Sequence, residues 1–504
     1  MISTVLENAA IVDGMGRSSY TTDVGIVDDR IVLIGDLRER DAAARIDCTG
    51  KTLSPGFIDV HSHSDELWLQ LPRCDGKIAQ GVTTEIGGNC GTSLEPAQLD
   101  ETFHEIERNG VALNVATLVG LGTTRRAVAG EADRPLERDE LEAQARLVRE
   151  GCERGALGVS SGLIYPPSMY ADTAELARMA QAARDAGAPR YVTHLRSEGD
   201  DLLDAVAEAI DVGRRAEVLV QCSHHKAAGK KNWGKVHQSL ELIDAARMRG
   251  IDVSCDAYPY VASWTDLATI LPAHARAGGV DATLARLADP RASVAIAMEL
   301  QLRHGEEWHD MLVTDVASAK NADLAGMRVD EIARAWHLSP AAAAIRLLRE
   351  ERLEIGAVFF KMCEEDVATV LSSEFCSIGS DASVRALSGP TARGVPHPRT
   401  FGTFPRVFAR FVRRRKTLDL LEAVRRMTSL PAGVFDLHER GSIAVGKYAD
   451  IVVFDAERIG DTATYEQPYQ FPVGIEHVFV NGRAVLLHGR FTSERPGRVL
   501  RHGR

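Results

Sequence analysis

Two histidines stand at the end of a short apolar run near the N-terminus. The run Gly56–Val60 is followed by His61, Ser62 and His63. In a β-strand, residues two apart point to the same face, so both imidazoles can reach one point at the carboxyl end of the strand. Imidazole is the side chain that most often binds metals near neutral pH, and one metal needs several converging ligands. The pair therefore indicates a metal site, provided that other segments supply further ligands.

Further candidate residues follow predicted strands later in the chain. They are Cys90 in the glycine-rich turn 87–93, His194, the neighbouring His224 and His225, and Asp381. A cysteine binds zinc as a thiolate or acts as a nucleophile, and an aspartate can transfer protons. Each residue alone has a simpler structural interpretation, as a small buried side chain, a hydrogen-bonded histidine or a turn cap. Their shared place at successive strand ends favours one catalytic centre.

The segments that must position these residues alternate between short apolar strands and amphipathic helices over residues 55–429. Eight predicted strands end near His61, Gly87, Val119, Gly162, Arg196, His225, Tyr258 and Asp381. Eight βα units is the count of a TIM-type (β/α)8 barrel, an α/β fold whose chemistry lies at the carboxyl ends of the strands. The last two strands are separated by over 120 residues. We therefore expect an insertion at about 275–345, rich in Ala and Arg and mostly helical.

Both ends of the chain carry short apolar runs that are broken by turn residues. Such runs lie at 23–27 and 30–34 near one end, and at 449–454 and 477–480 near the other. Asn481-Gly482 is a strong signal for a hairpin turn. Neither end has enough strands to bury a face alone, so residues 1–54 and 430–504 are predicted to combine into one small β-sandwich domain.

The composition argues against several classes of protein. The net charge of −12 at pH 7 argues against a nucleic-acid partner, because phosphate binding needs a basic surface. There is no run of 18 apolar residues and no basic stretch before an apolar core at the N-terminus, so we expect a cytoplasmic protein without a membrane partner. The eight cysteines are scattered without C-x-x-C pairs, as expected in the reducing cytosol.

Together the motifs resemble the amidohydrolase superfamily and, within it, the N-acyl-D-amino-acid deacylases (D-aminoacylases). The resemblance covers nearly the whole chain and is carried by residues 55–63, 88–91, 160–167, 193–198, 223–226, 256–260, 379–381, 396–406 and 441–450. The last segment is common across amidohydrolases, whereas Cys90 and His224-His225-Lys226 are more specific. The resemblance implies hydrolysis of the amide bond of an N-acyl-D-amino acid, or of a related D-configured N-acyl or dipeptide substrate.

The resemblance also implies how the metal site is divided. The ligands of a tightly held Zn²⁺, with one position left open for water, would be Cys90, His194 and His224. A second, weaker metal position would be formed by His61, His63 and Asp381. Asp381 would also act as general base, taking a proton from the metal-activated water and later giving it to the leaving amine. The motif register favours His224 over His225 as the ligand.

For a substrate with a free α-carboxylate, the resemblance implies a set of cationic, phenolic and hydroxyl contacts. The matching residues are Lys226, Arg399, Tyr165, Tyr258 and Ser263. Arg399 can grip a carboxylate through two hydrogen bonds, and Lys226 acts as a point charge. Trp264 departs from the pattern, because a small hydroxyl residue is common there, and Ala382 stands where glycine is usual. We expect a reshaped pocket and a slightly altered turn around an intact metal site.

Three alternatives stay open at this point. Hydantoinases and dihydroorotases hydrolyse cyclic amides with a bridging carboxylated lysine, but Gly87–Cys90 and Ser160-Ser161 occupy the corresponding strand ends here. A non-catalytic paralogue would have lost a ligand or the aspartate, whereas every position is filled. A Cys90 nucleophile with His194 as base would not need zinc, so metal analysis separates this hypothesis from the zinc hypothesis.

Overall fold

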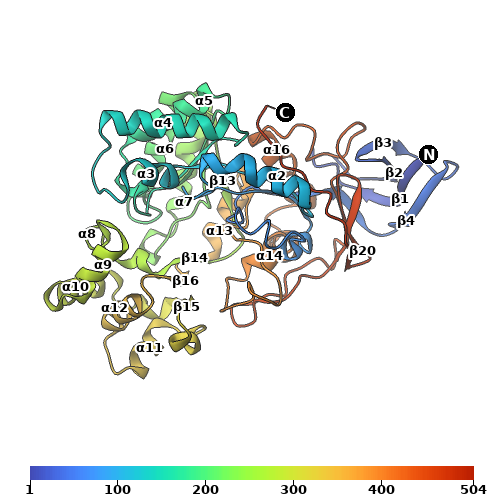
Figure 1. Ribbon diagram of the computed structural model, residues 1–504. Coiled ribbons are helices and arrows are strands. Elements are labelled where there is room, and N and C mark those ends of the chain that lie inside the picture. Colours follow the sequence, from blue (N-terminus) through green and yellow to red (C-terminus); the bar gives the residue numbers. More distant parts are fainter. Residues whose placement is uncertain (504) are drawn as a thin grey trace.

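The computed structural model describes residues 1–503 and has the predicted α/β class (Figure 1). Parallel strands in the middle of the chain carry the predicted site. In chain order they are β6 (Phe57–Asp59), β7 (Val82–Ile86), β8 (Asn114–Ala116), β9 (Val119–Gly120), β10 (Val159–Gly162), β11 (Arg190–His194), β12 (Leu219–Cys222), β13 (Val253–Ala257) and β17 (Cys376–Ile378). Only two residues separate β8 from β9, so the two form one strand position.

The parallel strands are paired in a circuit. β6 pairs with β7 and β7 with β8, while the second sheet has the order β9-β10-β11-β12-β13-β17. A parallel bridge between Ser62 and Ala382 leads from β17 back to β6, and the Asp381 amide donates to the His61 carbonyl at 2.9 Å. This is the strand order of a (β/α)8 barrel, in which the carboxyl ends of all strands open on one side.

Helices connect these strands and cover them from outside (Figure 1). The longer ones are α2 (Leu99–Asn109), α3 (Leu121–Ala129), α4 (Arg138–Glu153), α5 (Thr173–Asp185), α6 (Leu202–Ala216), α7 (Lys235–Met248), α13 (Glu364–Ser372), α14 (Arg399–Arg406) and α15 (Leu420–Met427). Helix α5 shows why they form: Asp172 caps its first turn by accepting from the Glu175 amide at 2.8 Å. Leu176, Met179 and Ala180 then bury one face against the strands. No helix of residues 1–503 is long and apolar enough to cross a lipid bilayer.

Strands from the two ends of the chain pair in a separate sheet, which lies on the right of Figure 1. Its order is β21-β20-β19-β18-β5-β1-β2-β3, with β4 beside β1. The strands are β1 (Ile2–Ile11), β2 (Tyr20–Val27), β3 (Arg30–Gly35), β4 (Ala42–Asp47), β5 (Thr52–Pro55), β18 (Ile451–Phe454), β19 (Ile475–Val480), β20 (Arg483–Leu487) and β21 (Arg490–Phe491). Asn481 and Gly482 form the turn between β19 and β20, and both have positive φ. The division of this sheet into two sandwich layers stays a prediction.

An insertion lies between β13 and β17 and has its own apolar core. Its antiparallel sheet consists of β14 (Ala262–Asp266), β16 (Ile355–Phe360) and β15 (Met311–Val316), in that order. Its helices are α8 (Ala273–Arg276), α9 (Gly279–Ala288), α10 (Pro290–His304), α11 (Val329–Ala335) and α12 (Pro340–Glu350). Leu287, Val313 and Leu348 are among the residues that fill the core. The expected helices of 275–345 are therefore accompanied by three strands, two of which lie outside that range.

A buried cation joins three strands of the circuit. Lys77, on the short helix α1 (Asp75–Ile78), lies 2.6 Å from Asp59 of β6 and 2.9 Å from Glu85 of β7. Its ammonium group also donates to Ser380 Oγ at 2.8 Å and to the Ala382 carbonyl at 2.9 Å, both just beyond β17. All three charged side chains are fully buried. Their desolvation is costly and is offset only while every partner is in place.

We expect Lys77→Met to lower the free energy of unfolding by about 3–5 kcal/mol, because it leaves two buried carboxylates without a counterion. Urea denaturation followed by tryptophan fluorescence measures the loss. Lys320→Met is the matched control: Lys320 lies 3.0 Å from Glu350, but its side chain is 66% exposed. Its loss should cost at most about 1 kcal/mol. Similar losses in the two variants would contradict the role given to Lys77.

Candidate metal centre and active site

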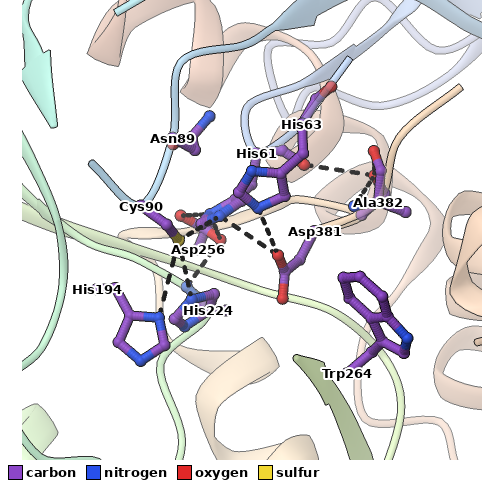
Figure 2. A network of polar contacts seen from close by, with 12 residues as sticks. His61, His63, Asn89, Cys90, His194, His224, Asp256, Trp264, Asp381 and Ala382 are labelled. Carbon is purple, nitrogen blue, oxygen red and sulfur yellow. Dashed lines mark hydrogen bonds and ion pairs between the residues drawn. The ribbon is translucent and has the colours of Figure 1, made fainter. Parts of the chain in front are cut away.

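The thiol of Cys90 lies among three imidazoles at the carboxyl ends of the parallel strands (Figure 2). Its Sγ is 3.3 Å from His61 Nε2, 3.5 Å from His224 Nε2 and 3.8 Å from His194 Nδ1. The four residues follow or end four different strands, β6, β7, β11 and β12. Parallel pairing therefore brings together donors that are far apart in the sequence.

The turn that carries Cys90 is held in a strained backbone conformation. Cys90 has φ 52° and Gly88 has φ 70°, values in the left-handed region that glycine tolerates best. A Cβ at Gly88 would also meet the Leu118 carbonyl oxygen at 2.2 Å. Asp65 fixes the turn by accepting from the Gly88 amide at 2.8 Å and from Thr117 Oγ1 at 2.6 Å. Asp65 thus shapes the turn and does not face the donor cluster.

His61 and His63 alternate with two serines that face the opposite side of the strand. Ser62 and Ser64 both donate to the buried carboxylate of Glu85, Ser64 at 2.8 Å. The period of two along a strand explains the sequence: histidines point to the site and serines to the carboxylate behind it. Glu85 therefore fixes the direction in which the two imidazoles point.

Asp381 lies beside His61 and His63 (Figure 2), and it also pairs with the buried guanidinium group of Arg399. Its Oδ1 is 3.1 Å from His63 Nε2 and 3.5 Å from His61 Nε2, and its Oδ2 is 2.8 Å from Arg399 Nη1. Burial alone would raise the pKa of the Asp381 carboxyl. The positive charges of Arg399, His224 and His61 instead hold that pKa well below its ordinary value. Asp381 is therefore an ionised carboxylate that can accept a proton.

The neighbouring histidines 224 and 225 point in different directions. His224 faces Cys90, and its φ of 35° turns the chain so that the next residue points away. The Nε2 of His225 lies 2.8 Å from Ser239 Oγ on α7. Burial lowers the pKa of His225 to about 4, so this imidazole is neutral. Only His224 belongs to the donor cluster.

A buried carboxylate that the sequence argument missed lies behind two of the histidines. Glu198 Oε1 is 2.9 Å from His224 Nδ1, Glu198 Oε2 is 3.9 Å from His194 Nε2, and the same carboxylate pairs with Lys226. In the neutral form of His224 that binds a metal, an Nδ1–H donated to Glu198 directs the Nε2 lone pair at the cluster. The motif 193–198, which contains His194, ends at Glu198. This motif was the signal by which Glu198 could have been found from the sequence.

Asp256 plays the same part for His61. It lies 3.2 Å from His61 Nδ1 and accepts from the His224 amide at 2.9 Å and from Gln221 Nε2 at 2.8 Å. It belongs to β13 and begins the motif 256–260, which was the available signal, although its contact with His61 follows only once the strands are placed. Two of the imidazoles thus have an acceptor on the nitrogen that faces away from the cluster.

A cavity of about 990 Å³ opens onto these donors. Tyr165, Lys226, Tyr258 and Ser263, all predicted substrate contacts, line it. The hydroxyls of Tyr258 and Ser263 are buried and have no hydrogen-bond partner within residues 1–503. The Tyr165 hydroxyl lies 2.7 Å from Thr265 Oγ1 of the insertion. The cavity is therefore bounded by the barrel strands on one side and by the insertion on the other.

Three other residues bear on the expected substrate contacts and on the two departures from the pattern. Arg399 packs over the Tyr258 ring at 4.6 Å and pairs with Asp381. Its contact with a substrate carboxylate stays a prediction. Trp264 lines the cavity, and its Nε1 donates to Thr314 Oγ1 at 2.8 Å. Ala382 is held through its carbonyl by the buried lysine.

The donor set suits a zinc ion. Thiolate and imidazole ligands are typical of zinc sites. Burial raises the pKa of the Cys90 thiol, but the charges of His61 and His224 outweigh it and lower that pKa well below the ordinary value. Three groups have donor atoms within 4.8 Å of one another: His61 with Cys90 and His224, His61 with His63 and Asp381, and His194 with Glu198 and His224. His61 therefore belongs to the donor groups of both metal positions that the sequence predicts as separate.

Known proteins match the chain over almost its whole length. The model of the amidohydrolase family matches residues 44–486. The N-acyl-D-glutamate deacylase of Alcaligenes xylosoxydans xylosoxydans is 36% identical, and the match covers 99% of this chain and 96% of the relative. The D-aminoacylase of the same organism is 35% identical, with 98% and 97% covered. A similar solved structure is that of N-acyl-D-glutamate deacylase from Bordetella bronchiseptica, complexed with zinc and a phosphonate mimic of the tetrahedral intermediate. Its sequence is 32% identical to this chain, and the superposition has a TM-score of 0.85 and covers 99% of each chain. The chain therefore belongs to the amidohydrolase family and, within it, to the N-acyl-D-amino-acid deacylases.

Proposed function

We propose that this protein is a zinc-dependent hydrolase of N-acyl-D-amino acids that releases a carboxylate and a free D-amino acid. The proposal rests on one observation above all: a thiol and three imidazoles converge beside an ionised aspartate at a cavity of about 990 Å³. The activities by which the relatives are named support the substrate class.

The tighter Zn²⁺ would be held by Cys90, His194 and His224, and a weaker second ion by His61, His63 and Asp381. Bound Zn²⁺ supplies an acidified water and polarises the amide carbonyl. Glu198 and Asp256 orient the imidazoles through their outer nitrogens, which raises their basicity as ligands.

Asp381 moves the proton in this proposal. As a carboxylate it accepts the proton of the attacking water, and as an acid it returns this proton to the departing amine nitrogen. Arg399 holds Oδ2 at 2.8 Å, so Oδ1 is left to face the histidines and the reacting groups. Arg399 acts through Asp381 and is a positioning residue.

Lys226 binds the α-carboxylate of the substrate in this proposal. It lines the cavity beside His224, and Glu198 holds its ammonium group in place. The α-carboxylate is attached to the carbon that bears the scissile nitrogen, so it must lie close to the metal donors. The partnerless hydroxyls of Tyr258 and Ser263 are available to hydrogen-bond the bound substrate.

Cys90→Ala should lose both zinc and activity, because the remaining imidazoles lack the thiolate that completes the tight set. Elemental analysis of protein purified without added metal measures zinc per chain, with about one equivalent expected in the wild type. Cys152→Ala, at a buried cysteine of α4, is the control and should keep both. Full wild-type activity in strong chelator with no metal bound would support a Cys90 nucleophile instead.

Asp381→Asn should keep the tight zinc while kcat falls by about 10²- to 10⁴-fold, the usual contribution of a positioned base. Steady-state kinetics together with elemental analysis test this expectation. Asp366→Asn, at a buried carboxylate of α13, serves as control and should leave kcat nearly unchanged. Turnover near that of the wild type in Asp381→Asn would rule out the proton-transfer role.

Lys226→Met should raise KM for N-acetyl-D-methionine by about 10- to 100-fold, because a charged hydrogen bond to the α-carboxylate is lost. The corresponding α-carboxamide, which lacks the charge, should be affected much less, so the ratio of the two kcat/KM values is the measurement. Lys231→Met is the control, since Lys231 pairs with Asp200 and is 74% exposed. An equal loss on acid and amide would show that Lys226 acts only through Glu198 and His224.

A further inference from the structure

Most of the cationic side chains around the cavity already have a carboxylate partner. The pairs are Arg126–Glu131, Arg196–Glu208, Lys226–Glu198, Lys230–Asp310, Lys231–Asp200 and Arg303–Glu299. Two further cavity-lining cations, Lys361 and Arg276, form no ion pair with any carboxylate of residues 1–503. Arg276 donates to the Ile164 carbonyl at 2.7 Å, so part of its guanidinium group is engaged. Lys361 has no such polar partner for its ammonium group.

The backbone of Lys361 is firmly fixed. The residue directly follows β16, the middle strand of the insertion sheet. Its carbonyl accepts from the Gly229 amide at 2.8 Å and from Trp233 Nε1 at 3.1 Å. These bonds attach the insertion to the segment that follows Lys226. Lys361 is therefore fixed at the wall of the cavity by backbone contacts that do not involve the charge of its side chain.

The surroundings of the Lys361 side chain favour an incoming anion. The residue is half-buried, and its Nζ lies 4.8 Å from the centre of the Phe359 ring. Burial lowers the pKa of Lys361. The charge of Glu198 opposes this shift and the charge of Lys226 adds to it, so the pKa stays below its ordinary value. A partly desolvated ammonium group without a counterion carries part of the cost of a buried charge, and a bound carboxylate would recover that cost. Lys361 thus lies on the same side of the cavity as Lys226 but belongs to the insertion.

We propose that Lys361 binds a second substrate carboxylate, the one at the end of an acidic D-amino-acid side chain. This inference rests on the proposed function and specifies its substrate class. Lys226, beside His224, accounts for the α-carboxylate, which must lie next to the scissile bond. Lys361 directly follows β16 of the insertion and lines the same cavity, close to the charges of Glu198 and Lys226, where it would meet the side chain of the same substrate. Selection of a charged group by a buried cation is stronger than selection by apolar fit, because a neutral substitute leaves the cation unpaired.

The test compares N-acetyl-D-glutamate with N-acetyl-D-glutamine, which have nearly the same shape and differ in side-chain charge. With the zinc-loaded wild-type enzyme, kcat/KM should be at least about 10-fold higher for the glutamate substrate. In Lys361→Met, kcat/KM for the glutamate substrate should fall by about 10- to 100-fold, while the value for the glutamine substrate changes little. Lys361→Arg should restore part of the preference, since it retains the charge. Lys230→Met is the matched control, because Lys230 also lines the cavity but pairs with Asp310 and is 64% exposed.

Several outcomes would overturn the inference. Equal losses on the two substrates in Lys361→Met would show a structural role for this lysine. A glutamate-specific loss in Arg276→Met but not in Lys361→Met would place the anion site at Arg276. A preference of the wild type for N-succinyl-D-methionine over N-acetyl-D-methionine that disappears in Lys361→Met would assign Lys361 to the acyl group. Hydrolysis of neither test substrate, nor of any other N-acyl-D-amino acid, would instead contradict the proposed function itself, and this inference with it.

Discussion

The buried charges of Lys77, Asp59 and Glu85 hold together the three strands from which much of the active centre emerges. An ammonium group among two carboxylates in a dry interior is tolerated only in one arrangement, because any shift of β6, β7 or β17 would leave a charge without its partner. The same arrangement sets the direction of His61 and the place of Asp381. The protein's own contacts thus position the donors, as a metal-dependent hydrolase requires.

Around the metal donors, the hydrogen-bond partners behind the side chains determine which atom of each side chain faces the cluster. Glu198 and Asp256 each take the outer nitrogen of an imidazole, and Arg399 takes one oxygen of Asp381. Each contact leaves the opposite atom free and directs it at the centre of the cluster. Side chains that never touch the substrate in our proposal therefore determine which lone pairs face it.

The sequence predicts the centre better than its surroundings, for a physical reason. His61, Cys90 and Asp381 each follow a short buried strand, and parallel strands bring such positions together wherever the helices lie. Arg399 could not be placed in this way, because its contact with Asp381 depends on how α14 packs after a long connection. Of the strands of the insertion, 262–266 mixes small, aromatic and polar residues and gave little signal, whereas 311–316 and 355–360 contain apolar runs that the sequence argument did not use.

The insertion has a core of its own and meets the rest of the cavity in part through backbone hydrogen bonds such as the one from the Gly229 amide to the Lys361 carbonyl. Backbone contacts do not depend on which side chain the residue carries. Substitutions along this wall can therefore accumulate without disturbing the strands that hold the donors. In evolution, and equally in the laboratory, the range of accepted amino acids can drift while the bond-breaking chemistry is inherited unchanged. A lineage of such enzymes need not pass through an inactive ancestor to acquire a new preference.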